Sequence, residues 1–562
     1  MNNIYRLLSV LIYPVFVGLL IFYVCRSRFN NELKKHKKEI IVNMLIILIL
    51  GIIGIFVYFR FETNAVYVYD DAGYYVKSLK LLQIFWDNPS FLFSKVYGTI
   101  NQDEYSYLPS LFNFWCLIIN NSYWFYCIIN YVLFLMPTYF LLLCLYYKHF
   151  DNKYLPIVYF FIFYPLWLTI LYGRVDCLGL FPLLIFYIIV IFGDYKDINK
   201  IDVLIINILT LTLMFERRWY LYALVGAYLA YLIKGIVYAY KNKDWLKSSL
   251  KFILSGFMAL VILLLFFRGF IINVMTVNNV EAYSFYNHSG KVSATINFYS
   301  IIVCLLALYG LIKLFIKDKL MSLSILTTII VPCILFWRTQ SFDLHHYLII
   351  CLSILVLFVL GIENIPYQKY SKLVICTLLL VQTCLIFTNV KVPLLTKVKK
   401  TISSNPYKDD LLDISEYLKE ISKDDGIYTY VAFGNNYLCD DSIKNVGLPD
   451  VDFPNMVSFI FDVRDGFPKD FGYIKYFVIS DPIIYMDENY QHMYKIISEA
   501  IMYDENISKI FTKVNEFTLE DDTKVYIYEM IGEYTFEMKQ YFYKKMLEYY
   551  PDKTDFYSYI LD

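Results

Sequence analysis

The stretch IIVNMLIILILGIIGIFVYF, residues 40–59, decides the class of this protein. It holds no charged residue over twenty consecutive positions. A helix of about twenty apolar residues is long enough to cross the hydrocarbon core of a bilayer. The stretch therefore predicts a membrane-spanning helix.

Similar uncharged runs recur over the first 390 residues, and the composition agrees, with 59% hydrophobic and 19% aromatic residues. They predict an α-helical polytopic membrane protein of about twelve spans. The first run is followed by basic residues instead of a small-residue cleavage site, which indicates a retained helix. The predicted spans are 8–24, 40–59, 123–147, 154–172, 175–193, 201–215, 218–237, 251–274, 298–316, 320–337, 347–362 and 372–390.

Lysine placement predicts the orientation, because cytoplasmic loops hold the excess of positive charge. The basic segment 26–38 and five later Lys-bearing loops fall on one side when the spans alternate. Both termini are then outside the cytoplasm, with a bacterial plasma membrane as the favoured location. The alternation depends on a turn at residues 216–218 between two short spans. The later loops carry Lys148, Lys153, Lys196, Lys200, Lys241, Lys243, Lys247, Lys317, Lys319, Lys369 and Lys372.

Arginine is distributed differently from lysine. The chain has ten Arg against forty Lys, and six of the ten lie at or near predicted outer ends of spans. Arg offers a planar fork that binds phosphate through two parallel hydrogen bonds. A ring of Arg therefore suits a phosphate headgroup, although any single one also suits a helix anchor at the interface. The six are Arg60, Arg174, Arg217, Arg218, Arg268 and Arg338.

The predicted outer loop 60–121 carries two adjacent carboxylates, Asp70 and Asp71. Like charges side by side raise each other's pKa, so one can act as a base or metal ligand while the other tunes it. A hydrated acidic loop is the alternative. Residues 74–86 predict an amphipathic helix in the interface that holds the pair there. Residues 107–119 are too short to span comfortably and are predicted to be interfacial or re-entrant.

Other titratable residues gather at the same predicted face. Arg174 and Asp176 stand two apart, which fits a structural ion pair as well as a site. Adjacent imidazoles in a turn are expected to point in different directions, so a zinc site made by two neighbouring His is not expected. For the neighbouring pair His345 and His346, a contact with a lipid phosphate or a helix cap is favoured. This face also holds Glu216, Glu281, His288, Asp343, His345 and His346.

The composition changes after residue 390. Residues 396–562 are richer in Asp, Glu and Lys, and their apolar runs shorten to strand length. They predict a soluble extracytoplasmic α/β domain that follows a membrane domain over 1–395. The expected strands are 427–433, 473–480 and 524–530, the expected helices are 411–421 and 490–502, and residues 520–522 form a hairpin turn.

Several function classes are disfavoured. The chain has no GxxxxGK phosphate loop, which argues against an ATP-driven pump. It has no CxxC metal pattern, and most of its eleven Cys lie inside predicted spans, where they serve as small apolar residues. The formal net charge is zero, so charge gives no reason to expect nucleic acid as a partner.

Tyr69-Asp70-Asp71-Ala72-Gly73-Tyr74-Tyr75 opens an outer loop after a span and is followed by an interfacial helix, many spans and an outer C-terminal domain. This arrangement resembles the GT-C glycosyltransferases, especially the bacterial protein O-mannosyltransferase-like and aminoarabinose-transferase-like enzymes. Their early outer loop carries Asp-Glu or Asp-Asp before a Tyr. The resemblance covers the architecture of about 40–395. Here the second acid is Asp where Glu is common, and an extra helix precedes the usual first span.

The resemblance implies a sugar donor carried on a polyprenyl phosphate, and a protein, lipid or cell-envelope glycan as acceptor. A carboxylate takes the acceptor proton, the hydroxyl attacks the anomeric carbon, and the lipid phosphate leaves with inversion. Asp70 is the implied base, Asp71 its partner and Asp176 a second acid. Mg²⁺ or Mn²⁺ on Asp70 and Asp71 is compatible with these roles but not required. The implied substrate-binding residues are Arg174, Glu216, Arg217, Arg218, Arg338, His345 and His346.

Two other classes stay open. A transporter or flippase of a lipid-linked sugar would place ionisable groups near the membrane midplane, whereas the charges here gather at one face. A structural or sensory membrane protein with an outer partner-binding domain would leave the Arg distribution unexplained.

Overall fold

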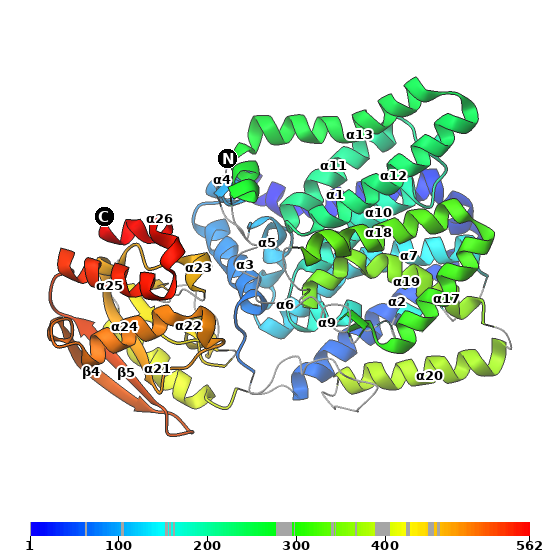
Figure 1. Cartoon of the computed structure of the whole chain (residues 1–562). Coiled ribbons are helices and arrows are strands. Elements are labelled where there is room, and N and C mark those ends of the chain that lie inside the picture. Colours follow the sequence, from blue (N-terminus) through cyan, green and yellow to red (C-terminus); the bar gives the residue numbers. More distant parts are fainter. Residues whose placement is uncertain are drawn as a thin grey trace. The chain divides into compact units, whose positions relative to one another are not determined.

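The computed structural model divides into two compact units (Figure 1). Unit 1 comprises residues 1–61 and 77–401, and unit 2 comprises residues 62–76 and 402–562. The structure describes residues 2–61, 65–102, 106–151, 156, 159–160, 163, 165–276, 295–296, 298–338, 342, 344–365, 368–387, 405–422, 428–435, 437–447, 455–457 and 461–562. The predicted outer-face residues Glu281, His288 and Asp343 lie outside these ranges.

Unit 1 is helical throughout its described part. In chain order it contains α1 (Asn2–Arg28), α2 (Asn30–Phe61), α3 (Asp70–Asp87, shared with unit 2), α4 (Phe91–Gln102), α5 (Leu108–Asn113), η1 (Phe114–Ile118), α6 (Tyr123–Asn130), η2 (Tyr131–Leu135), α7 (Met136–His149), α9 (Pro165–Leu171), η3 (Asp176–Gly179), α10 (Leu180–Val190), η4 (Tyr195–Asp197), α11 (Lys200–Glu216), α12 (Tyr220–Asn242), α13 (Trp245–Phe266), α14 (Arg268–Thr276), α17 (Ile301–Lys317), α18 (Lys319–Trp337), η5 (Leu344–Tyr347), α19 (Leu348–Glu363) and α20 (Gln368–Phe387).

Seven helices of the described chain are long and apolar enough to cross a membrane. Each predicted span overlaps at least one helix, but several helices are short, including α11 and α17 with 17 residues each. The sequence-based number of twelve spans therefore stays a prediction. The seven are Asn2–Arg28, Asn30–Arg60, Tyr123–His149, Tyr220–Asn242, Trp245–Phe266, Lys319–Trp337 and His345–Glu363.

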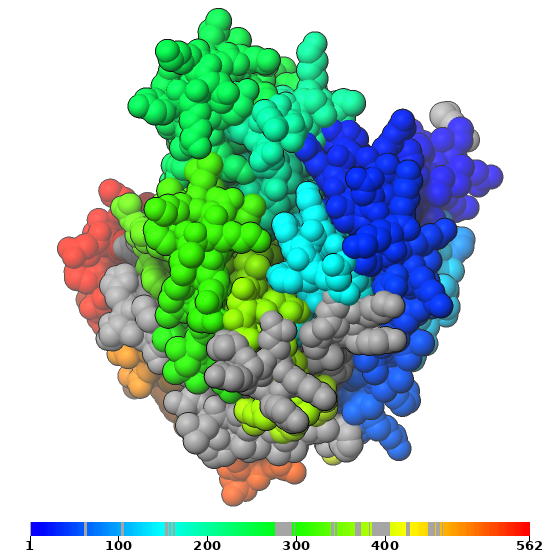
Figure 2. Space-filling model, turned by 90° about the vertical axis from the view of Figure 1, so that its right-hand side faces the viewer, coloured from blue at the N-terminus to red at the C-terminus, as the bar shows by residue number. Residues whose placement is uncertain are grey.

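The centre of unit 1 is a bundle in which α10, α12, α18 and α19 run side by side (Figure 1). Helix α17 packs closely on α19, because Gly310 and Gly361 remove the side chains at the crossing. A Cβ on Gly310 would collide with the backbone oxygen of Leu357. Small residues permit such close approach of helices in membranes. In Figure 2, the dark blue atoms of α1 and α2 lie along the right-hand side of the view.

The predicted turn at 216–218 is confirmed. Helix α11 begins with a capping box in which the Asn199 side chain accepts the backbone N–H of Asp202, and it ends at Glu216. Arg217 adopts an extended conformation and closes the helix, and α12 begins three residues later. The two helices are therefore separate elements.

The segment 107–119 packs inside unit 1. It forms α5 and the short helix η1, and most of its side chains are buried. The Ser78 hydroxyl donates to Asn113 Oδ1 at 2.9 Å, and Asn113 Nδ2 donates to Asn130 Oδ1 at 2.8 Å. These bonds explain why the segment turns back into the unit. The helix predicted over 74–86 is confirmed as part of α3, while the membrane-surface position of both segments stays a prediction.

Unit 2 is built on a five-stranded mixed sheet of order β2-β1-β3-β5-β4. Strands β2 (Asn455–Val457), β1 (Tyr428–Val431) and β3 (Ile474–Asp481) are parallel, and β3, β5 (Lys524–Met530) and β4 (Phe511–Thr518) are antiparallel. The α/β fold and the hairpin turn are as predicted. The helices are α21 (Lys408–Ile421), α22 (Asp440–Asn445), α23 (Asp462–Asp465), α24 (His492–Tyr503), α25 (Phe536–Tyr549) and α26 (Thr554–Tyr557).

Alternation along the strands gives unit 2 two cores. Phe477 and Ile479 of β3 face the core that includes residues of α24 and α25, whereas Val478 faces the core that includes residues of α21. Val66 is buried in this second core. Residues 62–76 therefore belong with the C-terminal domain, because an apolar side chain of that segment completes its core. The sequence-based division into 1–395 and 396–562 had placed this segment in the membrane domain.

Candidate functional site

The candidate site of unit 1 lies where η3, α11 and η5 have their ends. Gly173 has a φ of +67°, and a Cβ there would collide with the hydroxyl of Tyr123. That hydroxyl donates to the backbone oxygen of Tyr172 at 2.7 Å. Only glycine adopts this turn without strain. The turn brings the chain from α9 to Arg174 and then to Asp176, the first residue of η3.

Asp176 and Arg217 form a buried ion pair. Arg217 Nε lies 3.1 Å from Asp176 Oδ1, and the two side chains are 2% and 1% exposed. Trp219 Nε1 donates to the same oxygen at 3.1 Å. The Tyr220 hydroxyl donates to the Asp176 backbone oxygen at 2.6 Å. These contacts fix Asp176 from the α11–α12 connection, so residues of 174–176 and 216–218, which the sequence placed only on a common outer face, meet in one cluster.

Three carboxyl oxygens of this cluster have no hydrogen-bond partner in the described part of the chain. They are Asp176 Oδ2 and both Oε atoms of Glu216. Both residues are buried, at 0% and 1% exposure. An unpaired buried polar group costs about 1–3 kcal/mol, so native proteins rarely keep three together. Unpaired oxygens at one place therefore indicate a site that receives donors from a ligand or water.

Aromatic and imidazole rings line the cluster. The Arg217 guanidinium stands 3.8 Å from the centre of the Trp219 ring. The Trp219 ring is 4.9 Å from His345 and 4.8 Å from His346, centre to centre. Arg174 Nη1 contacts His345 Nδ1. Trp219 is thus clamped between a cation and two imidazoles.

The expectation that His345 and His346 point in different directions is wrong. Their ring centres are 3.9 Å apart, because both lie in the tight 3-10 turn η5, with Trp219 against the two rings. Within the described ranges, no group of three or more His, Cys, Asp or Glu is arranged to hold a metal ion. The divalent cation suggested for Asp70 and Asp71 stays a prediction.

Not every predicted binding residue joins the cluster. Arg338 is exposed at the end of α18 and forms no ion pair with a described residue. Arg60 and Arg268 are also exposed, and Arg218 is half-buried next to Arg217. The structure thus brings together Arg174, Asp176, Glu216, Arg217, His345 and His346 of the predicted set. Sequence reasoning missed Trp219, although it directly follows the charged run 216–218.

Asp70 and Asp71 belong to unit 2, in the first turn of α3. They are half-buried, and carboxylates are stabilised at a helix N-terminus by the helix dipole. Tyr69 precedes them with a φ of +52°, a strained conformation for a bulky residue. Its backbone N–H donates to Asp441 Oδ2 at 2.9 Å. Strain held by a specific contact is common at functional sites.

A second acidic pair, Asp440 and Asp441, opens α22 in the same unit. Lys444 Nζ lies 2.7 Å from Asp440 Oδ2 and 3.8 Å from Asp441 Oδ1. Burial, followed by the charge of Asp440, raises the pKa of Asp441 to about 6, and Asp70 contributes in the same direction. Asn445 Nδ2 donates to the Tyr67 backbone oxygen at 3.0 Å. Helix α22 therefore fixes the backbone that leads to Asp70.

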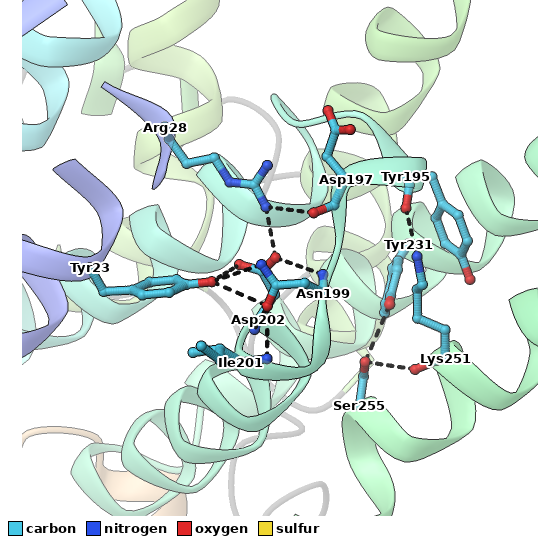
Figure 3. A network of polar contacts seen from close by, with 10 residues as sticks. All are labelled: Tyr23, Arg28, Tyr195, Asp197, Asn199, Ile201, Asp202, Tyr231, Lys251 and Ser255. Atoms are coloured by element: carbon cyan, nitrogen blue, oxygen red, sulfur yellow. Dashed lines mark hydrogen bonds and ion pairs between the residues drawn. The ribbon is translucent and has the colours of Figure 1, made fainter. Parts of the chain in front are cut away.

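A polar network of a different kind surrounds Asp202 near the other end of α11 (Figure 3). Arg28 Nη2 lies 2.8 Å from Asp202 Oδ2, and the Tyr23 hydroxyl donates to Oδ1 at 2.9 Å. The Asn199 backbone N–H donates to Oδ2 at 2.9 Å. Both carboxylate oxygens are thus engaged. This network ties α1 to α11, and it engages both Asp202 oxygens without a ligand.

Comparison with known proteins leaves the geometry as the guide to function. No family model matches the chain, and no curated protein or solved structure is significantly similar to it.

Proposed function

We propose that this chain is a membrane glycosyltransferase of the GT-C type. It would transfer a sugar from a polyprenyl-phosphate donor to an acceptor hydroxyl on the extracytoplasmic face of a membrane. The carrying observation is the buried cluster of unit 1, in which Asp176 and Glu216 keep three unpaired oxygens beside Arg217 and Trp219. The seven apolar helices are compatible with a lipid-linked donor.

The cluster has the chemical groups that a sugar phosphate requires. Sugar hydroxyls are donors, and Asp176 Oδ2 and the two Oε atoms of Glu216 are acceptors with no hydrogen-bond partner among the described residues. Arg217 and Arg174 are cations that can face the phosphate as its charge develops. Burial strengthens each of these interactions.

Transfer then proceeds by a single displacement. A carboxylate accepts the proton of the acceptor hydroxyl as its oxygen attacks the anomeric carbon. The bond from that carbon to the phosphate oxygen breaks, and the lipid phosphate leaves with the electron pair. The anomeric centre is inverted. On the resemblance to the GT-C enzymes, we assign the base to Asp70 and a tuning role to Asp71.

The test starts by finding the donor. Mass spectrometry of lipid-linked sugars from cells with and without the chain should show one species accumulating when the chain is absent. Transfer by the purified full-length chain is then followed with that species. Asp70→Asn keeps the shape and removes the proton acceptor, so the rate should fall by about 10² to 10⁴. Donor binding should stay near wild type.

The matched control is Asp87→Asn at the other end of the same helix, where the side chain is exposed. It should leave the rate unchanged. Full transfer activity in a purified Asp70→Asn, Asp71→Asn double variant would overturn the proposed mechanism. Movement of the lipid-linked sugar across vesicles without any transfer product would instead establish the flippase alternative.

A further inference from the structure

A cavity of about 350 Å³ lies within unit 1, away from the candidate site. Its walls come mainly from α7, α17, α18 and α19, and include Leu142, Leu145, Leu314, Ile325, Leu355 and Val359. Leu355 comes ten residues after His345, about 15 Å further along helical chain. A cavity of this size and lining is typical of a site for an apolar ligand.

The rim of the cavity is basic. Lys313 and Lys317 stand one turn apart on α17 and both line it, together with His149 at the end of α7. Neither lysine forms an ion pair with a described residue. Lys313 Nζ lies 5.2 Å from the Tyr309 ring centre. Lys317 and Lys148 both interact electrostatically with the His149 ring.

One acid, Asp318, also lines the cavity, but it has a structural task. Its Oδ1 accepts the backbone N–H of Met321 at 2.9 Å and caps α18. The two lysines therefore leave the rim with an excess of positive charge. In Figure 2, yellow-green atoms from the region of α19 and α20 are visible between the green atoms of α17 and α18 and the cyan atoms of α7.

We propose that this cavity binds an anionic membrane phospholipid. The acyl chain enters the apolar interior, and the phosphate meets Lys313 and Lys317 at the rim. A free phosphate would satisfy the lysines but leave the apolar walls unfilled. A zwitterionic lipid would fill the walls but bring its own cation to the lysines. Basic pockets between membrane helices on the lysine-rich side commonly bind anionic headgroups.

The test uses the purified full-length chain and native mass spectrometry. The probes are phosphatidylglycerol, phosphatidylcholine with the same acyl chains, and inorganic phosphate. Phosphatidylglycerol should bind, with at least tenfold preference over phosphatidylcholine. The Lys313→Gln, Lys317→Gln double variant should lose about 10- to 30-fold in phosphatidylglycerol affinity, at about 1 kcal/mol for each lysine. Its phosphatidylcholine binding should not change.

The control removes two charges elsewhere on the predicted lysine-rich side. Lys241→Gln, Lys247→Gln lies outside the cavity lining and should keep wild-type phosphatidylglycerol affinity. A second variant, Leu355→Trp, fills the cavity and should weaken phosphatidylglycerol binding without removing charge. Equal affinity of the wild type for both lipids would overturn the proposal, whether or not the variants fold. So would displacement of the lipid by millimolar inorganic phosphate, which would identify a plain anion site.

Discussion

Helix α11 has a buried acid near each end, about 20 Å apart along the helix axis, and the two ends differ in how they treat it. Asp202 has every carboxylate oxygen engaged by Arg28, Tyr23 or the backbone of Asn199. At the other end, Glu216 has neither oxygen engaged by the described residues, and neighbouring Asp176 has only one.

The difference separates structure from function. Burial of charge alone does not distinguish the two ends, since both hold an Arg paired with an Asp. The two ends differ in whether the carboxyl oxygens have hydrogen-bond partners, and folding alone favours carboxyl oxygens that are paired. At the Asp202 end both carboxylate oxygens have partners, and the acid holds helices together. At the Glu216 end, the unpaired oxygens can accept hydrogen bonds from a ligand or water.

The largest effect is expected at the Asp202 end. Asp202→Ala leaves Arg28 without its carboxylate in a buried setting, which should lower the free energy of unfolding by about 3–5 kcal/mol. Reversible unfolding in mixed micelles measures this loss. The Asp202→Leu, Arg28→Met double variant should regain most of the stability, since an apolar pair removes both charges together. A loss in Asp202→Ala below about 1 kcal/mol would show that the network is not structural.

Glu216→Gln tests the end with unpaired oxygens. It keeps the shape of the side chain, so the free energy of unfolding should change by less than about 1 kcal/mol. The transfer rate should fall by about 10² to 10³, because the amide replaces one acceptor oxygen by an N–H donor at the reacting sugar. Asp197→Asn, exposed near the other end, is the control with normal rate. Normal transfer by Glu216→Gln would remove the distinction between the ends.

Replacement of Arg217 and of Arg338 by Lys should have smaller effects, on donor affinity. Arg217→Lys keeps a positive charge but loses the planar fork, so donor affinity should fall about tenfold. Arg338→Lys, at an exposed position that forms no ion pair with a described residue, should cost less than threefold. Isothermal titration with the lipid-linked donor measures both. If Arg338→Lys cost as much as Arg217→Lys, the phosphate site would extend beyond the buried cluster.

Asp441 extends the comparison to unit 2, where the expected effect is on stability alone. Its pKa is raised from 3.8 to about 6 by burial and by Asp440, so the folded unit holds a proton there that the unfolded chain has released. The stabilising contribution of Asp441 is therefore fully present below about pH 4 and is lost as pH rises through 6, by on the order of 1–3 kcal/mol. The urea concentration at which buried Cys439 becomes reactive measures this fall, in a variant lacking the other thiols. Asp441→Asn should remove the part of the pH dependence that Asp441 contributes and leave that of Asp462, whose pKa burial also raises to about 6.

Sequence patterns located most elements because each depends on local chemistry. The uncharged run 40–59 and the alternating apolar residues of 474–481 carry their own periodicity. The clustering of Asp176 with Arg217 was anticipated only as a shared outer face. Their direct pairing could not be predicted, because it requires the turn at Gly173 and the break after Glu216 to meet.

The contacts that sequence missed join residues far apart in the chain. Tyr69 and Asp441 are separated by 372 positions, and no local pattern announces their hydrogen bond. Trp219 was overlooked because an aromatic after a charged run is common at helix ends. Its role depends on His345 and His346, which come more than a hundred residues later.

The discontinuous make-up of unit 2 has a consequence for synthesis of the chain. Residues 62–76 leave the ribosome about 20 to 75 s before Asp441, at the usual 5–20 residues per second. During that interval Val66 has no core to enter and Tyr69 has no contact to hold its left-handed backbone. In a chain truncated after residue 395, Val66 and Tyr69 would never gain these contacts. The acidic pair can acquire its final geometry only when translation is nearly complete, which keeps the proposed base unformed in partly made chains.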